Sequence, residues 1–135
     1  MDLKKHHILI VEDEINLLRP MEFILTSRDY QVSTANTGFK GLRSFIFYQN
    51  TETPVDLLVT DLQIPGLPGL DLMQEVKKLC PQIPIIIITG FIEKIPKKMD
   101  FQDNWKLLKK PFSETRLLQD IETLLPDSVT VGGGS

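Results

Sequence analysis

Side chains that could carry out chemistry follow four of the five apolar, β-rich segments of this sequence. They are Glu12, Asp13 and Glu14 after the first segment, Asp61 after the third, Thr89 at the end of the fourth and Lys110 after the fifth. Each of them alone has an ordinary explanation, because acids often cap helices and polar residues often make turns. If the segments are parallel strands of one sheet, however, their carboxyl ends share the edge at which α/β proteins bind ligands. We therefore predict that these groups meet in one small basin.

This set of groups suits phosphoryl transfer. Clustered carboxylates repel one another unless a cation lies among them, and an all-oxygen site with few protein ligands favours Mg²⁺. An aspartate beside such a metal can act as a nucleophile, so Asp61 is the candidate to form an aspartyl phosphate. Lys110 would hold one phosphoryl oxygen as a point charge, and Thr89 would donate a hydrogen bond to another. Gly90 has no side chain and leaves room for the phosphoryl group.

The elements that must position these groups alternate along the chain. The β-rich segments are His7–Val11, Tyr30–Ala35, Val55–Thr60, Ile83–Thr89 and Trp105–Lys109. A helical spacing of apolar residues follows each of them, with Thr37 and Ser113 placed to cap the second and fifth helices. This alternation predicts an α/β fold with a single doubly wound, five-stranded parallel sheet flanked by five helices. The second and fifth segments mix polar and apolar residues, which predicts that they are the edge strands.

Prolines disturb two of the predicted helices. Pro20 falls inside the first helical pattern, where it removes a hydrogen bond and should kink the helix or delay its start. Pro96 interrupts the fourth pattern, but it suits the first position of a helix that begins near Ile95. We therefore predict a short, irregular fourth helix after a longer, mobile loop at Gly90–Lys94.

Length and composition bound the class of protein. The 135 residues suffice for one domain with a core, which we place at 1–126, followed by a linker-like tail at 127–135 that ends in GGGS. The net charge of −3 argues against nucleic acid as a partner. The absence of a long apolar run or a secretory signal predicts a cytoplasmic protein without a membrane segment, and the single cysteine, Cys80, fits a reducing compartment. His6 and His7 are expected to be solvated.

Four sequence pieces together carry a resemblance. ILIVEDE, VTDLQIPGLPGLDLM, IIIITG and KKPF occur in this order, and over about Lys4–Leu125 the chain resembles the receiver domain of two-component response regulators. The resemblance implies the strand order 2-1-3-4-5. It also implies that Asp61 accepts a phosphoryl group from a phosphohistidine on a sensor histidine kinase or histidine phosphotransfer domain. The domain would then switch the face formed by the fourth helix, fifth strand and fifth helix, and would catalyse only its own phosphorylation and dephosphorylation.

The resemblance also assigns roles within the site. It implies that Asp13 and Asp61 bind Mg²⁺ directly, with Mn²⁺ as a substitute, together with the backbone carbonyl of Gln63. Glu12 would act mainly through water. Thr89 matches the switch hydroxyl, and Lys110 matches the lysine that contacts the phosphoryl group. A cis peptide bond to Pro111 is implied as well and would aim this lysine inward.

One position departs from the family pattern. The family usually carries an aromatic residue three positions before the lysine, where this chain has Leu107. Trp105 falls on the same strand face as Leu107, so our hypothesis is that Trp105 covers the fourth-helix surface instead. A plain hydrophobic cover of the sheet edge is the alternative. Phe91 and Gln63 flank the site and are expected to influence the lifetime of the phosphoryl group.

Other functions are open at this stage. A receiver that acts as a scaffold without taking phosphate is one alternative. An aspartyl-nucleophile phosphatase is another, but that chemistry needs a second acid two residues after Asp61, where this chain has Gln63. A flavin-binding module would need a phosphate-cradling loop, whereas the first strand is followed by EDE. The sequence does not name the kinase or the output, and it leaves open a homodimer through the face of the fourth and fifth helices.

Overall fold

The computed structural model describes residues 5–96 and 104–126, and it contains one parallel sheet of five strands in the order β2-β1-β3-β4-β5. The strands are β1 (His7–Val11), β2 (Gln31–Ala35), β3 (Leu57–Asp61), β4 (Ile85–Thr89) and β5 (Trp105–Lys109). The helices are α1 (Ile15–Ser27), α2 (Gly38–Gln49), α3 (Gly69–Leu79), the 3-10 helix η1 (Ile92–Lys94) and α4 (Glu114–Leu124). The predicted fold class, strand order and edge strands are confirmed.

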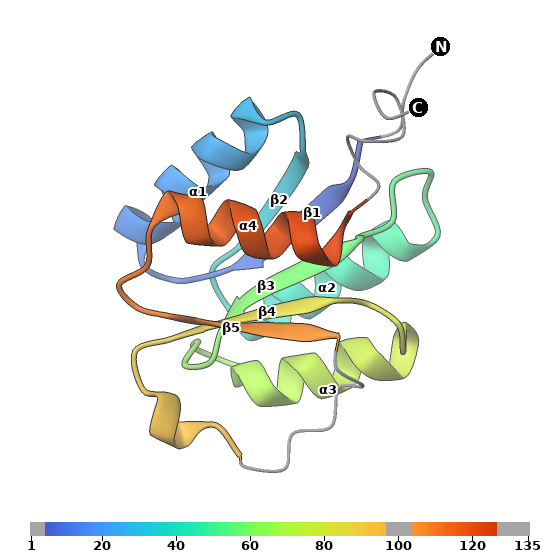
Figure 1. Cartoon of the computed structure of the whole chain (residues 1–135). Helices are drawn as coiled ribbons and strands as arrows, with labels where there is room; N and C mark the ends of the chain where they lie inside the picture. The colour runs from blue at the N-terminus through green and yellow to red at the C-terminus, as the bar shows by residue number, and fades with distance from the viewer. Residues whose placement is uncertain (1–4, 97–103, 127–135) are drawn as a thin grey trace.

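Burial explains which strands are central. Every residue of β1, β3 and β4 is buried, as continuous apolar runs in the middle of a parallel sheet require. Edge strands β2 and β5 are only partly buried. Helices α1 and α4 cover one face of the sheet, and α2 and α3 cover the other (Figure 1). Each face therefore has its own apolar core, and the carboxyl ends of all strands open at one edge.

The number of helices differs from the prediction. The described residues contain four α-helices and η1, so five flanking helices are not confirmed. Ile95 and Pro96 are not helical, so the expected place of Pro96 as the first residue of a helix is wrong. The rest of the predicted fourth helix falls on 97–103, outside the described residues. The predicted loop at Gly90–Lys94 contains η1.

Helix termini follow the local sequence. The Thr37 side chain accepts a hydrogen bond from the backbone N–H of Lys40, and the Ser113 side chain accepts one from that of Arg116, so both predicted caps are confirmed. Pro20 lies within α1, which begins at Ile15. Pro20 therefore does not delay the start of this helix. None of the helices among the described residues has the length and apolar character needed to cross a membrane.

His7 differs from the expectation of a solvated side chain, because it is fully buried at the start of β1. Its Nδ1 lies 2.8 Å from the carbonyl oxygen of Thr53, and its Nε2 lies 2.7 Å from Ser33 Oγ. The ring also makes an edge-on contact with Tyr48. A histidine that has partners on both ring nitrogens is compatible with burial, so His7 ties β1 to β2 and to the segment before β3.

Candidate functional site

Asp61 is a buried carboxylate at the carboxyl edge of the sheet that is held at both of its oxygens. It is the last residue of β3, is 5% exposed and pairs in register with Ile88 of β4. Its Oδ1 accepts a 2.9 Å hydrogen bond from the backbone N–H of Gln63, and its Oδ2 accepts a 2.6 Å hydrogen bond from Lys110 Nζ. The backbone of β3 and the loop that follows therefore hold the carboxylate in one orientation.

Lys110 gathers three carboxylates. Besides Asp61, its Nζ lies 2.8 Å from Glu14 Oε1 and 3.4 Å from Glu12 Oε1. Its backbone N–H donates to the carbonyl oxygen of Thr89, and a cis peptide bond joins it to Pro111, as the resemblance implies. The ammonium group thus lies among acidic groups from β3 and from the loop that follows β1.

Burial and charge act in opposite directions on Lys110. Burial lowers the pKa of its ammonium group, but hydrogen bonds from the ammonium to Asp61 and Glu14, with the charges of Asp61 and Glu12, outweigh burial and raise the pKa above its ordinary value. Lys110 therefore stays protonated at neutral pH. A permanent positive charge is what a group that holds a phosphoryl oxygen requires.

Glu12 is a carboxylate in an unusual environment. Its Oε2 accepts a 2.9 Å hydrogen bond from the backbone N–H of Glu14, while its buried Oε1 accepts none from any described residue. Burial raises the pKa of Glu12 to about 7, and the charge of Asp61 adds to this, although the Glu14 N–H and Lys110 partly oppose the shift. Lys110 Nζ lies 3.4 Å from Oε1, and a divalent cation near this oxygen would lower the cost of charging Glu12 further.

The acidic cluster fits a divalent cation. Glu12, Asp13 and Asp61 each offer an oxygen, and these oxygens lie within 4.8 Å of one another. Asp13 is exposed, so water can complete the coordination shell. An all-oxygen donor set with an accessible side, beside a buried carboxylate oxygen that lacks a hydrogen bond, has the chemistry that Mg²⁺ prefers.

Thr89 and Gly90 lie beside this cluster without joining it. Thr89 is fully buried at the end of β4, and its Oγ1 accepts a 2.9 Å hydrogen bond from the backbone N–H of Phe91. The described structure shows no hydrogen bond between the Thr89 hydroxyl and Asp61. A Cβ atom added at Gly90 would meet nothing within 4 Å. The open space at Gly90 is compatible with an incoming phosphoryl group.

The loop between β3 and α3 is fixed by close backbone packing. A Cβ atom on Gly69 would collide with the backbone of Asp61 and lie 2.9 Å from Leu62 Cα. Gly66 has a φ of 80°, a conformation that glycine adopts readily. Gly38, at the start of α2, donates its N–H to Pro65, and a Cβ at Gly38 would collide with the Leu67 backbone. These contacts fix the path of the chain after Asp61; the metal-binding role of the Gln63 carbonyl stays a prediction.

The position at which the family pattern is broken, Leu107, is the middle residue of β5. Trp105 and Leu107 both pack, partly buried, against the core that contains Ile85 and Ile87, and Ile95 joins the same core. This confirms that Trp105 and Leu107 share a strand face. The predicted cover of the fourth-helix surface involves 97–103, which lie outside the described residues.

Sequence reasoning placed Glu14 at this edge but gave it no role. The structure pairs Glu14 Oε1 with Lys110 at 2.8 Å, although 63% of the Glu14 side chain is exposed. One feature of the sequence pointed to a role for Glu14. It is the third acid of EDE, and only the first two, Glu12 and Asp13, were assigned to the metal site. An exposed acid before a helix is usually a cap, and here the Glu14 side chain makes no cap hydrogen bond.

Known proteins show the same organisation. Residues 8–122 match the family model of the response regulator receiver domain. The chain is 35% identical over 130 residues to transcriptional regulatory protein GlrR of Escherichia coli, with 95% of this chain covered but only 28% of that protein. The chain thus spans less than a third of the length of this relative.

Solved structures agree on the fold. A response regulator receiver domain protein from Clostridium thermocellum has a TM-score of 0.74 at 27% identity, with 94% of this chain and 96% of that chain covered. The receiver domain of sensor histidine kinase PA1611 from Pseudomonas aeruginosa, which holds a magnesium ion in its active-site cleft, has a TM-score of 0.75 at 23% identity, covering 91% and 99%. With the matched family model, the strand order and the acidic edge in agreement, the chain belongs to the receiver domains of two-component response regulators.

Proposed function

We propose that Asp61 is the phosphoacceptor of this receiver domain and takes a phosphoryl group from a phosphohistidine of a sensor histidine kinase or a histidine phosphotransfer domain. The observation that carries the proposal is the double anchoring of its carboxylate, by the Gln63 N–H at 2.9 Å and by Lys110 at 2.6 Å. A nucleophile held at both oxygens is presented in a fixed direction, which lowers the entropic part of the barrier.

The proposed transfer exchanges one bond to phosphorus for another. A carboxylate oxygen of Asp61 forms a bond to phosphorus while the bond from phosphorus to the imidazole nitrogen breaks, and that nitrogen keeps the electron pair. Hydrolysis reverses the state, because water forms the new bond to phosphorus and the carboxylate of Asp61 leaves, which releases inorganic phosphate. The chain in this proposal catalyses only its own phosphorylation and dephosphorylation and is not otherwise an enzyme.

We assign the metal to Asp13, Asp61 and the Gln63 carbonyl, with Glu12 acting through water. When bound, Mg²⁺, or Mn²⁺ in its place, supplies charge neutralisation at the phosphoryl oxygens. Lys110, whose Nζ lies 2.6 Å from Asp61 Oδ2, holds a phosphoryl oxygen. Its ion pairs with Glu12 and Glu14 keep the ammonium group in place before the phosphoryl group arrives.

Thr89 is the proposed switch residue. Its hydroxyl is bound to the Phe91 N–H at 2.9 Å, so an approach toward a phosphoryl group would change this bond and with it the chain that leads into η1. The phosphoryl group can bias the conformation only by the difference between its contacts in the two states. The proposed response reaches the surface of β5 and α4 and the chain before them, where an output partner or a second copy would bind.

The test is phosphorylation by acetyl phosphate in the presence of Mg²⁺, read by intact mass. The expected result is one acid-stable, base-labile phosphoryl adduct on the unmodified protein and none on Asp61→Asn. Asp71→Asn, which removes an exposed carboxylate from the first turn of α3, is the matched control and should still be phosphorylated. An adduct on Asp61→Asn would refute the assignment. No adduct with any donor, although Mg²⁺ binds, would favour the scaffold alternative.

A further inference from the structure

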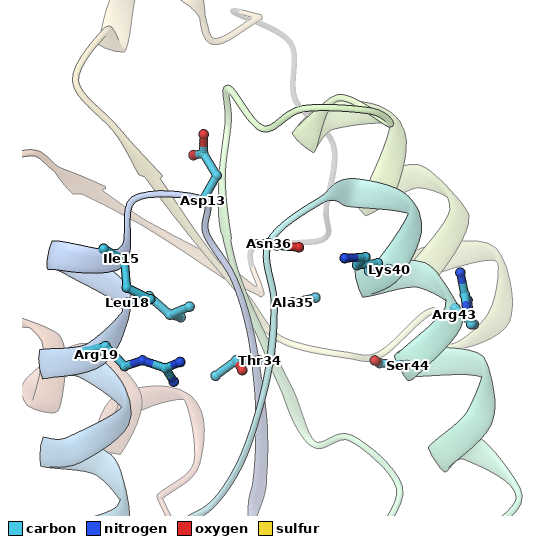
Figure 2. Close-up of a pocket in the computed structure, with 10 residues that line it drawn as sticks. All are labelled: Asp13, Ile15, Leu18, Arg19, Thr34, Ala35, Asn36, Lys40, Arg43 and Ser44. Carbon is cyan, nitrogen blue, oxygen red and sulfur yellow. The ribbon is translucent and has the colours of Figure 1, made fainter.

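A groove lies beside the unpaired edge of β2, between α1 and α2 (Figure 2). Its volume is about 530 Å³. Its lining includes three cations, Arg19 from α1 and Lys40 and Arg43 from α2, against one carboxylate, Asp13, so the charged lining is positive on balance. The polar side chains of Thr34, Asn36 and Ser44 also line it. In Figure 2 the guanidinium group of Arg19 extends toward Thr34 across the groove.

The backbone of β2 offers hydrogen-bonding groups to this groove. Gln31 donates its N–H to His6, and Ala35 accepts from the N–H of Glu12, so the odd-numbered residues of β2 bond to β1. In a parallel ladder the alternate residues point their N–H and C=O groups the other way. Val32 and Thr34 therefore direct theirs outward, and both residues are partly exposed. Thr34 lines the groove, and Val32 lies two residues before it on the same open edge.

The two sheet edges are protected differently. Strand β5 carries Lys106 and Lys109, and charged side chains of this kind discourage pairing with another chain. Strand β2, with the sequence QVSTA, has neither a charge nor a proline. The edge that lies in the groove is therefore the one that can accept a further strand.

The charges that line the groove indicate what kind of segment could pair with β2. Lys40 and Arg43 have no ion pair among the described residues, and Arg19 shares its charge with Glu22 at 2.8 Å. A net charge of −3 for the whole chain makes this local excess of cations on α2 stand out. A second copy of the chain would bring the same cations against each other, which is unfavourable. A small anion could pair with the cations but would leave the outward backbone groups of β2 unused.

We propose that this groove binds an extended, acidic segment of a partner protein, which adds as a sixth strand beside β2. Main-chain hydrogen bonds to Val32 and Thr34 would supply affinity, and carboxylates would supply specificity. Alternate side chains of the added strand point to opposite faces. Carboxylates on one face would meet Arg19, and those on the other face would meet Lys40 and Arg43. The proposal does not depend on phosphorylation of Asp61.

The test uses the full chain, without phosphodonor or Mg²⁺, and a blocked peptide of repeating Glu-Glu-Val-Val, which places carboxylates on both faces of an extended strand. The same peptide with Lys in place of Glu is the control. We expect binding of the Glu peptide, with shifted and exchange-protected amide signals of Val32 and Thr34 in NMR spectra, and affinity that falls as salt is raised. Arg43→Glu and Arg19→Glu should each weaken binding by about tenfold or more, whereas Lys78→Glu on α3 should leave it unchanged.

Four outcomes would overturn the proposal. One is equal binding of the Lys peptide, and another is binding that survives both Arg19→Glu and Arg43→Glu. The third is a shift at Arg43 with inorganic phosphate as strong as with the peptide and no protection of Val32, which would indicate a small-anion site. The fourth is self-association through β2 in light scattering. All the substituted side chains are exposed, and circular dichroism confirms that each variant is folded.

Discussion

Lys110 donates a 2.6 Å hydrogen bond to Asp61 across 49 positions of sequence. The ammonium group offsets the charge of the proposed nucleophile and, at the same time, pairs with Glu12 and Glu14. An ion pair therefore connects the loop that carries Lys110 to the end of β3 before any phosphoryl group is present.

Replacing Lys110 by Met should impair both folding and phosphorylation. The free energy of unfolding should fall by about 1–3 kcal/mol, because Glu12 and Asp61 lose the cation between them. The rate of phosphorylation by acetyl phosphate should fall about 100-fold, since one group that stabilises developing negative charge is gone. Lys109→Met, one residue away and exposed, should match the unmodified protein in both measurements. Equal phosphorylation rates for the two variants would contradict the role of Lys110.

Glu12 should make the metal-free protein less stable as the pH rises. Its pKa is about 7 in the folded chain and has an ordinary value of 4.5, so between these values the folded state holds a proton that the unfolded state has lost. Stability must then fall as pH rises from about 4.5 to about 7 and stay low above that. Urea unfolding of Glu12→Gln should show a flatter profile over this window and higher stability above pH 7. An unchanged profile would show that Glu12 is charged at little cost.

Removal of Mg²⁺ should lower the melting temperature through Asp13. A ligand that binds only the folded state at 100 times its dissociation constant stabilises by about 2.7 kcal/mol. Asp13→Asn should abolish this gain, but without metal it should melt no lower than the unmodified protein, because it removes a like charge from the cluster Glu12–Asp13–Asp61. The control Asp71→Asn should keep the full response to Mg²⁺. A full Mg²⁺ response in Asp13→Asn would place the metal elsewhere.

Alanine should lower the stability of the protein at Gly69 but leave it nearly unchanged at Gly90. Gly69→Ala forces a Cβ atom against the backbone of Asp61 and Leu62, so unfolding measurements should show a loss of about 1–3 kcal/mol. Gly90→Ala places its Cβ in open space, so stability should change by less than about 0.5 kcal/mol. If Gly90 makes room for the phosphoryl group, Gly90→Ala should nevertheless be phosphorylated more slowly. Equal rates for Gly90→Ala and the unmodified protein would remove that role.

Trp105 is the single tryptophan and gives a direct optical signal. It packs partly buried in the same core as Ile95, near the chain that follows Thr89. If it takes part in the switch, beryllofluoride with Mg²⁺ should change its fluorescence, and Thr89→Ala should reduce the change. Constant fluorescence, while a melting shift shows that beryllofluoride binds, would leave Trp105 as a hydrophobic cover of the edge.

Much of the fold could be predicted because burial leaves a direct trace in sequence. A short, continuous run of β-branched residues such as Ile85–Ile88 is typical of an interior strand, and the mixed pattern of Gln31–Ala35 is typical of an edge. Since side chains at the carboxyl ends of parallel strands converge, the grouping of Asp61 with Lys110 also followed from the order of elements.

What could not be predicted depends on side-chain geometry. The pairing of Glu14 with Lys110 joins residues 96 positions apart and needs a particular rotamer of each. The burial of His7 depends on acceptors from Thr53 and Ser33, which no local pattern links to it. The 3-10 helix η1 was not predicted for a different reason. A single helical turn is too short to show a periodic pattern of apolar residues.

The contact between Gly38 and the loop after β3 has a consequence for protein engineering. Gly38 bonds to Pro65, and it can carry no side chain beside Leu67. The start of α2 and the segment that follows β3 thus form one composite part, although they are distant in sequence. A chimaera that takes this segment from another receiver should also take 36–41, since either piece alone would meet a surface that was shaped for a different neighbour.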